Sequence, residues 1–160
     1  FTMSICNLRP QSRGEVTINS KNPEDLPKII PNYLSTQSDQ KIAIDSIKVA
    51  RKIANASPLK QHILDEFVPG GSLVSDEDLL EAAKNNSQSI YHPVGTCKMG
   101  NDKNSVVDDQ LKVYGVKGLR VVDASIMPEL VSGNTNAPTM MIAEKAAEMI
   151  LSDNKVSLTK

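Results

Sequence analysis

The sequence predicts an α+β fold, and three observations support this class. Short β-prone runs occur near the amino end and again between residues 106 and 125. Four longer segments have the composition of helices, and the clearest of them place apolar residues at helical spacing. Loops that contain Pro and Gly separate these elements. A chain of 160 residues with 39% hydrophobic residues is long enough to bury one core, or two small ones.

The amino-terminal segment is expected to contain strands. Residues 1–6 and 16–18 are apolar and β-prone, and the turn-rich residues between them predict a hairpin or a strand–loop–strand unit. Because the chain opens on residues typical of a strand already under way, we expect further sequence upstream of Phe1. Three prolines between residues 23 and 31 then predict an extended surface segment.

Helices are predicted in the middle of the chain and near its carboxyl end. Ser and acidic residues mark two of the expected helix starts, where a side-chain oxygen can accept a free backbone N–H. The predicted helices run from Ser38 to Ser57, over residues 58–67, from an N-cap at Ser75 through Lys84, and over residues 138–151.

The remaining segments are interpreted as a shaped loop and short strands. Residues 90–100 have no helical period and contain one Pro and two Gly, which predicts a loop of defined conformation. Residues 106–108 and 111–113 suggest short strands, and residues 118–125 predict a buried strand that ends in polar residues.

Composition excludes several functional classes. With 18 basic and 19 acidic residues, the chain offers no broad electrostatic attraction for nucleic acid. No apolar run is long enough for a transmembrane segment. Two cysteines do not form a disulfide scaffold, and no Cys or His cluster has the spacing of a metal site. Nucleophile-elbow, phosphate-loop and dinucleotide-binding glycine motifs do not occur.

Individual residues give several candidates for chemistry. His62 is predicted to be a surface residue of a helix, and Cys97 a buried thiol. His92 precedes Pro93, so its ring is held on a stiff backbone, and it is either a functional side chain or a hydrogen-bonded loop histidine. Residues 132–139 lead into a helix whose free N–H groups would favour an anion or an electron-rich carbonyl, unless Asn136 or its neighbours cap it.

Several of these segments occur together in the order found in one enzyme family. Four of them resemble the C-terminal signature of the glucose–methanol–choline (GMC) oxidoreductases, namely residues 92–100, 106–108, 115–128 and 132–145. Residues 8–14 and 32–34 also resemble the substrate domain of this family. The sequence is most similar in style to the insect glucose dehydrogenase-like and choline dehydrogenase-like branches, and the insect branch would be compatible with an extracellular protein.

The resemblance implies the C-terminal part of a two-domain flavoprotein that binds FAD. Residues 1–112 would belong to a substrate-binding domain with an antiparallel sheet and helices. Residues 113–153 would supply the closing strand and helix of a Rossmann-like FAD domain, and residues 154–160 a tail. The N-terminal FAD-binding portion of the family is missing from this sequence and would be a necessary partner.

The resemblance also assigns individual residues. His92 matches the active-site histidine of the family, and Asn136 matches a second catalytic position that is histidine in some members and asparagine in others. The positions implied to lie beside FAD are Asp123, Ala124, Asn136, Pro138 and Thr139.

The implied reaction is oxidation of a small-molecule alcohol, by proton abstraction and hydride transfer to flavin N5. Histidine side chains in general titrate near neutral pH, so His92 can accept the hydroxyl proton, while the Asn136 amide can orient the substrate oxygen. The electron acceptor is left open between oxygen, a quinone and another carrier. Two alternatives also stay open: a hydroxynitrile lyase-type relative without net redox, and a non-catalytic relative.

Overall fold

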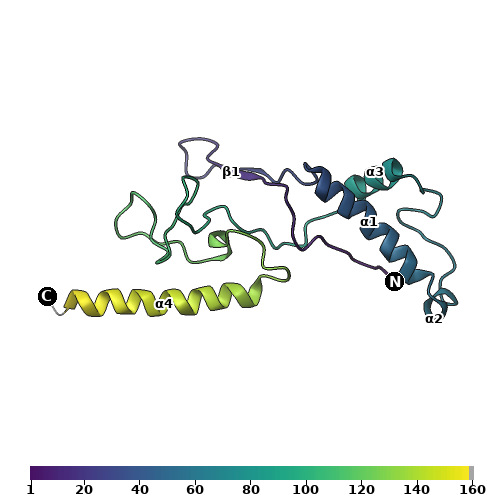
Figure 1. Cartoon of the computed structure of the whole chain (residues 1–160). Coiled ribbons are helices and arrows are strands. Elements are labelled where there is room, and N and C mark those ends of the chain that lie inside the picture. The colour runs from purple at the N-terminus through teal and green to yellow at the C-terminus, as the bar shows by residue number, and fades with distance from the viewer. Residues whose placement is uncertain (159–160) are drawn as a thin grey trace. The chain divides into compact units, whose positions relative to one another are not determined.

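The computed structural model describes residues 1–158 and divides the chain into two compact units, residues 1–89 and residues 90 onward (Figure 1). Helices dominate and a small antiparallel sheet accompanies them, which confirms the α+β class at this level. The domain boundary predicted at residue 112 falls inside the second unit and stays a prediction. The elements, in chain order, are β1 (Glu15–Thr17), β2 (Lys28–Ile30), α1 (Gln37–Ala54), α2 (Ser57–Lys60), α3 (Asp76–Asn86), η1 (Ala124–Ile126) and α4 (Asn136–Leu158).

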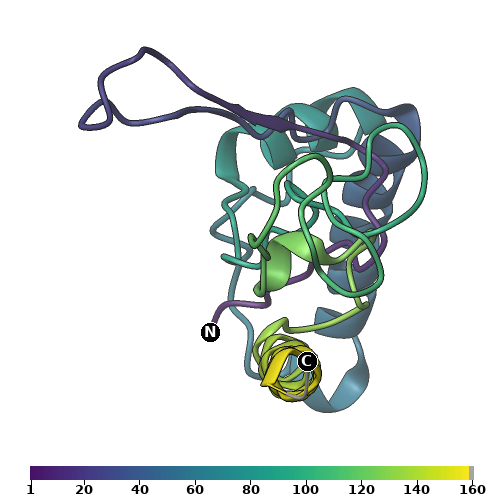
Figure 2. The same cartoon turned by 90° about the vertical axis from the view of Figure 1, so that its left-hand side faces the viewer.

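The sheet of the first unit is one hairpin. β1 pairs antiparallel with β2, and Val16 lies opposite Ile29. The loop between the strands extends away from α1 and α3 (Figure 2). The strand predicted at residues 16–18 therefore corresponds to β1, but its predicted pairing with residues 1–6 is wrong. Residues 1–6 are not a strand, because the segment expected to be a proline-interrupted surface stretch supplies the pairing strand instead.

Two helices of the first unit begin at side-chain caps. The Thr36 hydroxyl accepts the Asp39 N–H at 3.2 Å, so the N-cap of α1 lies two residues before the Ser38 cap that the sequence predicted. Ser75 caps α3 as predicted, and its hydroxyl accepts the Asp78 N–H at 3.1 Å. The two helices pack on each other, and Leu79 of α3 is 1% exposed.

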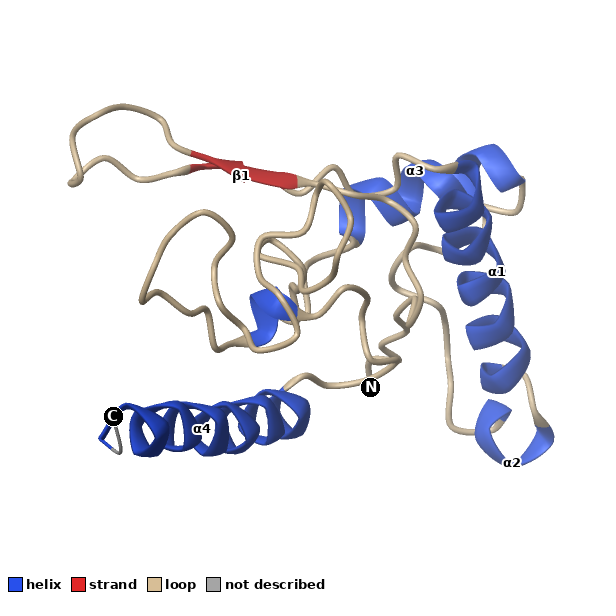
Figure 3. Cartoon of the chain, turned by 60° about the vertical axis from the view of Figure 1, so that its left-hand side comes forward, coloured by secondary structure: helices blue, strands red, loops and turns tan. Residues whose placement is uncertain are grey.

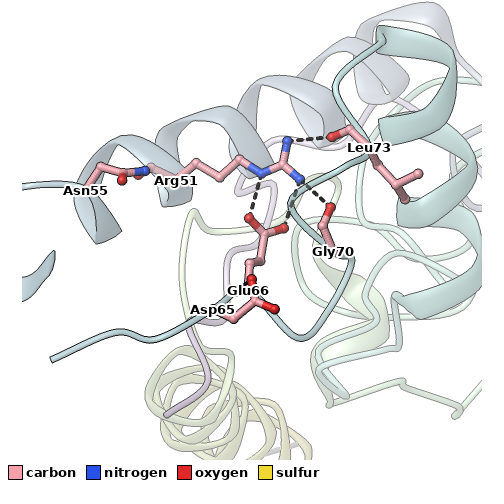
Figure 4. Close-up of polar contacts among 6 residues, drawn as sticks. All are labelled: Arg51, Asn55, Asp65, Glu66, Gly70 and Leu73. Carbon is pink, nitrogen blue, oxygen red and sulfur yellow. Dashed lines mark hydrogen bonds and ion pairs between the residues drawn. The ribbon is translucent and has the colours of Figure 1, made fainter.

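The helix predicted over residues 58–67 is much shorter than expected. α2 ends at Lys60, and the chain then forms turns up to α3. Arg51 of α1 fixes this stretch (Figure 4): its guanidinium donates to both carboxylate oxygens of Glu66, at 2.8 and 2.9 Å. It also donates to the carbonyls of Gly70 and Leu73, at 3.1 and 2.7 Å. One side chain therefore replaces the regular hydrogen bonds that a helix would have supplied.

Asp39 fixes the amino-terminal segment to the start of α1. Its side chain is buried, and its carboxylate accepts the backbone N–H groups of Gln11 at 2.9 Å and Ser12 at 2.6 Å. The amide of Asn7 donates to the same carboxylate at 3.0 Å. Burial opposes ionisation, but the hydrogen bonds from Ser12 and Gln11 outweigh it and hold the pKa of Asp39 below its ordinary value.

The second unit consists of loops packed beside η1 and one face of α4 (Figure 3). The strands predicted at residues 106–108 and 111–113 are reduced to isolated bridges, such as Val107 with Val113. The buried strand predicted over residues 118–125 is also wrong. Only Arg120 forms a bridge, to Lys112, because the described residues supply no longer strand alongside it.

The core of the second unit joins the loops to α4. Val107 is fully buried, and Ile142 and Ala146 from successive turns of α4 complete the cluster with η1. The helix predicted over residues 138–151 is confirmed and is longer at both ends. Residues 154–158 of the predicted tail continue α4, and residues 159–160 lie outside the described residues. Among residues 1–158, no helix combines the length and the apolar character that a membrane span requires.

Candidate functional site

His92 lies in the shaped loop of the second unit and points a ring nitrogen at the start of α4. Its imidazole is half-buried, and Nδ1 lies 3.0 Å from the hydroxyl of Thr135. The residue before it, Tyr91, has a left-handed φ of 61°, which shows that the backbone here is held in a specific turn. The predicted loop of defined conformation is therefore confirmed, and it carries an oriented histidine.

Backbone hydrogen bonds fasten this loop along η1. The N–H of Cys97 donates to the carbonyl of Ser125 at 3.0 Å, and the N–H of Met99 donates to Ile126 at 2.7 Å. Gly95 has a φ of 88°, and a Cβ at this position would lie 3.2 Å from the carbonyl oxygen of Met127. Glycine is thus required both by the conformation and by the close approach of the two backbones.

The two other single-residue predictions concern His62 and Cys97. His62 is exposed, as predicted for a surface histidine. Cys97 is a free, half-buried thiol rather than a fully buried one. In the described part of the chain, no group of three His, Cys, Asp or Glu residues could hold a metal ion. The loop also has an ion pair at its surface, where Lys98 donates to Asp102 and lowers the pKa of that carboxyl.

The start of α4 places the other candidate residues on one helical turn. Thr135 is buried, and its carbonyl accepts the Thr139 N–H at 3.0 Å and the Thr139 hydroxyl at 2.7 Å. Asn136, the first helical residue, is exposed, and Pro138 is the third. Because His92 bonds to the residue directly before Asn136, the structure brings the two predicted catalytic positions to the same helix end.

This helix end differs electrostatically from the starts of α1 and α3. The first turn of α3 contains Asp76, Glu77 and Asp78, and that of α1 contains Asp39. The first turn of α4 contains no acidic residue. The partial positive charge of the α4 amino end is therefore not neutralised by its own side chains, which suits an anionic or electron-rich group.

Asp123 and Ala124 lie at η1. The Asp123 carboxylate accepts the N–H of Ser125 at 2.8 Å and so caps the short helix. Ala124 is half-buried and packs against the core cluster. The structure thus gives Asp123 a local structural role and leaves its side chain exposed. Its contact with a cofactor stays a prediction.

Thr135 is the residue at this site that the sequence did not single out. A possible signal was Pro138, because proline as the third helical residue removes the N–H that a capping threonine commonly binds. The missing N–H leaves the Thr135 hydroxyl available for another partner, but the sequence does not show which residue that partner is.

Comparisons with known proteins find similarity to one enzyme family. The model of the family described as GMC oxidoreductase matches residues 10–143. An alcohol dehydrogenase (acceptor) from Pseudomonas putida is 52% identical over 151 residues, which cover 94% of this chain and 27% of that protein. An oxygen-dependent choline dehydrogenase from Escherichia coli O139:H28 is 45% identical over 150 residues, with the same two coverages of 94% and 27%. The solved FAD-dependent oxidoreductase from Chaetomium thermophilum matches with a TM-score of 0.87 at 33% identity, covering 92% of this chain and 26% of that one. The chain spans about a quarter of the length of these relatives.

Proposed function

Because this chain belongs to the GMC oxidoreductase family, we propose that it forms part of an FAD-dependent enzyme that oxidises a primary or secondary alcohol. The observation that carries the proposal is the oriented His92 at the amino end of α4, directly before Asn136. A proton acceptor and an amide donor at one helix end are the groups that removal of an alcohol proton requires.

In this proposal His92 takes the proton of the substrate hydroxyl at its free ring nitrogen, Nε2. The exposed Asn136 amide donates to the substrate oxygen and orients it. The chemistry that FAD supplies when bound is acceptance of a hydride from the carbon that bears the hydroxyl. The substrate thereby loses two electrons and two hydrogens and becomes a carbonyl compound.

The donor set at the start of α4 fits the electron-rich edge of a flavin. The helix presents backbone N–H groups without an acidic residue in its first turn. Asn136, Pro138 and Thr139 would hold this edge of the cofactor, and Asp123 and Ala124 would lie beside it. Negative charge that develops on the reduced ring would be stabilised by the positive end of the helix dipole.

The rest of the enzyme would come from sequence equivalent to the remaining length of the relatives. The surface of α4 supports this part of the proposal. Ile142 and Ala146 face the core of the second unit, whereas the large apolar side chains of Met140, Met141 and Leu151 are exposed on α4. Large apolar side chains exposed on a helix indicate a further packing partner, and we assign this partner to the FAD domain.

The composition of the chain favours an uncharged alcohol over choline. A quaternary ammonium is usually bound by a cage of aromatic rings, and this chain contains no Trp, three Tyr and two Phe. Tyr91 is the aromatic residue next to His92 in sequence. We therefore propose neutral alcohols as the substrate class to test first.

Anaerobic mixing of the protein, at the full length of its relatives, with neutral alcohols tests the proposal. We expect the flavin absorbance to bleach, since the alcohol is the reductant. His92→Ala should slow this reduction by about 10²- to 10⁴-fold, the usual contribution of a general base. Asn136→Ala should slow it by about 10²- to 10³-fold, as for loss of one donor to a developing oxyanion. An oxidised flavin that never bleaches would support a lyase-type or non-catalytic protein instead.

A further inference from the structure

The hydroxyl of Thr135 has a partner outside its own helix. The Thr135 carbonyl accepts the first hydrogen bond of α4, from the N–H of Thr139, which makes Thr135 the N-cap. Such a hydroxyl commonly accepts the N–H of the second or third helical residue. The third residue here is Pro138, which has no N–H. The Thr135 hydroxyl pairs with Nδ1 of His92 instead, at 3.0 Å.

The surroundings hold this hydroxyl in place. Thr135 is 8% exposed, so water does not readily replace the histidine as its partner. Its main chain is fixed by two hydrogen bonds from Thr139, and its β-branched side chain has few rotamers. His92 approaches from a loop that is itself hydrogen-bonded to η1. Both partners therefore come from anchored backbone.

The direction of the hydrogen bond follows from the task proposed for His92. A neutral imidazole carries its proton on one nitrogen and a lone pair on the other. If the Thr135 hydroxyl accepted the proton of Nδ1, the lone pair would be on Nε2, and this bond would persist after Nε2 took a proton. If the hydroxyl donated to Nδ1, Nε2 would already carry a proton and could not act as a base.

We propose that Thr135 is a positioning residue, whose hydroxyl accepts the Nδ1 proton of His92 and so keeps Nε2 as the proton-accepting atom. The inference rests on the proposed function and deepens it. Thr135 acts through the orientation and the tautomer of the imidazole, not by its own contact with the alcohol.

The first test reads the tautomer directly, without using catalysis. Nitrogen-15 NMR of selectively labelled histidine distinguishes a protonated Nδ1 from a protonated Nε2 in the complete flavoprotein, and His92→Ala identifies the signals. We expect the Nδ1-protonated form to dominate in the unchanged protein and in Thr135→Ser, which keeps the hydroxyl. Thr135→Val, of nearly the same shape, should give a mixture in which the Nε2-protonated form is prominent.

A matched control removes a different hydroxyl from the same loop. The hydroxyl of Ser132 is buried and has no hydrogen-bond partner among the described residues. Ser132→Ala should leave the tautomer of His92 unchanged. If Thr135→Val retains the tautomer of the unchanged protein, or if Ser132→Ala shifts it as much, the proposal is overturned.

The second test separates positioning from binding. In Thr135→Val we expect flavin reduction at saturating alcohol to slow about tenfold, the rate equivalent of one hydrogen bond, with an unchanged apparent Kd for the alcohol. Thr135→Ser should restore the rate. A raised Kd at an unchanged limiting rate would contradict a positioning role. If His92→Ala reduces flavin at the normal rate, the proposed function of His92 fails, whereas the NMR measurement still decides whether Thr135 sets the tautomer.

Discussion

Replacing Asp39 by Asn tests how the first unit holds its amino-terminal segment. The Asp39 carboxylate accepts the N–H of Ser12 on one oxygen and the amide of Asn7 on the other, and the Gln11 N–H reaches both. Asparagine keeps one acceptor oxygen and places an NH₂ group against the donors that faced the second. Loss of one hydrogen bond to a charged group costs about 1.5–3 kcal/mol.

The expected effect is local and is measured by amide hydrogen exchange. The N–H groups of Gln11 and Ser12 should exchange up to about a hundredfold faster in Asp39→Asn, because each 1.4 kcal/mol is about a factor of ten in the opening equilibrium. Asp45→Asn provides the matched control, since Asp45 lies on the same helix, is 48% exposed and pairs with Lys41. Such a surface pair is worth about 0–1 kcal/mol. Equal protection of Gln11 and Ser12 in the two variants would refute the anchoring role of Asp39.

Three further results are expected. Folding lowers the pKa of Asp39 below its ordinary value of 3.8. The contribution of Asp39 to stability is therefore complete above about pH 3.8 and is lost as the pH falls through the lowered pKa. Equal protection of the Gln11 N–H at about pH 5 and below the lowered pKa would contradict this. Arg51→Lys keeps the charge but loses the bidentate hydrogen bonds to Glu66, so a protease should cleave residues 66–73 faster. An unchanged cleavage rate would contradict the role of Arg51 in fixing this segment. Ile142 is 8% exposed in the core, so Ile142→Ala should lower the free energy of unfolding, measured by urea denaturation, by about 2–5 kcal/mol. A decrease of less than about 1 kcal/mol would show that Ile142 is not tightly packed.

Local sequence signals predicted the helices well. The N-cap at Ser75 and the three acids after it marked the start of α3 correctly, because the capping bond joins residues three apart. The start of α1 was displaced by two residues, since Thr36 and Ser38 are both suitable capping residues and only the backbone decides between them. Helix α2 was overestimated because the bonds from Arg51 that shape the following turns cross 15 or more residues.

Strands were predicted less well for the same physical reason. A strand is stabilised by a partner that can lie anywhere in the chain, so β-prone residues indicate strand potential but not pairing. Residues 1–6 have that potential and remain unpaired, whereas Lys28–Ile30 forms β2 between prolines. Residues 118–125 likewise form a single bridge, at Arg120. In the proposed complete enzyme, strands of the FAD domain would be the missing partners.

The amino ends of the three longer helices show where local stability and function diverge. In α1 and α3, a hydroxyl caps the helix and acidic residues follow it, so local sequence and helix dipole agree. In α4 the first turn contains no acid, and the hydroxyl of its cap, Thr135, binds His92. The acidic residues that stabilise the first turns of α1 and α3 are thus absent at the helix start that also carries Asn136. Departures from local rules concentrate at functional sites in folded proteins, so this departure supports the proposal that the catalytic centre lies at the start of α4.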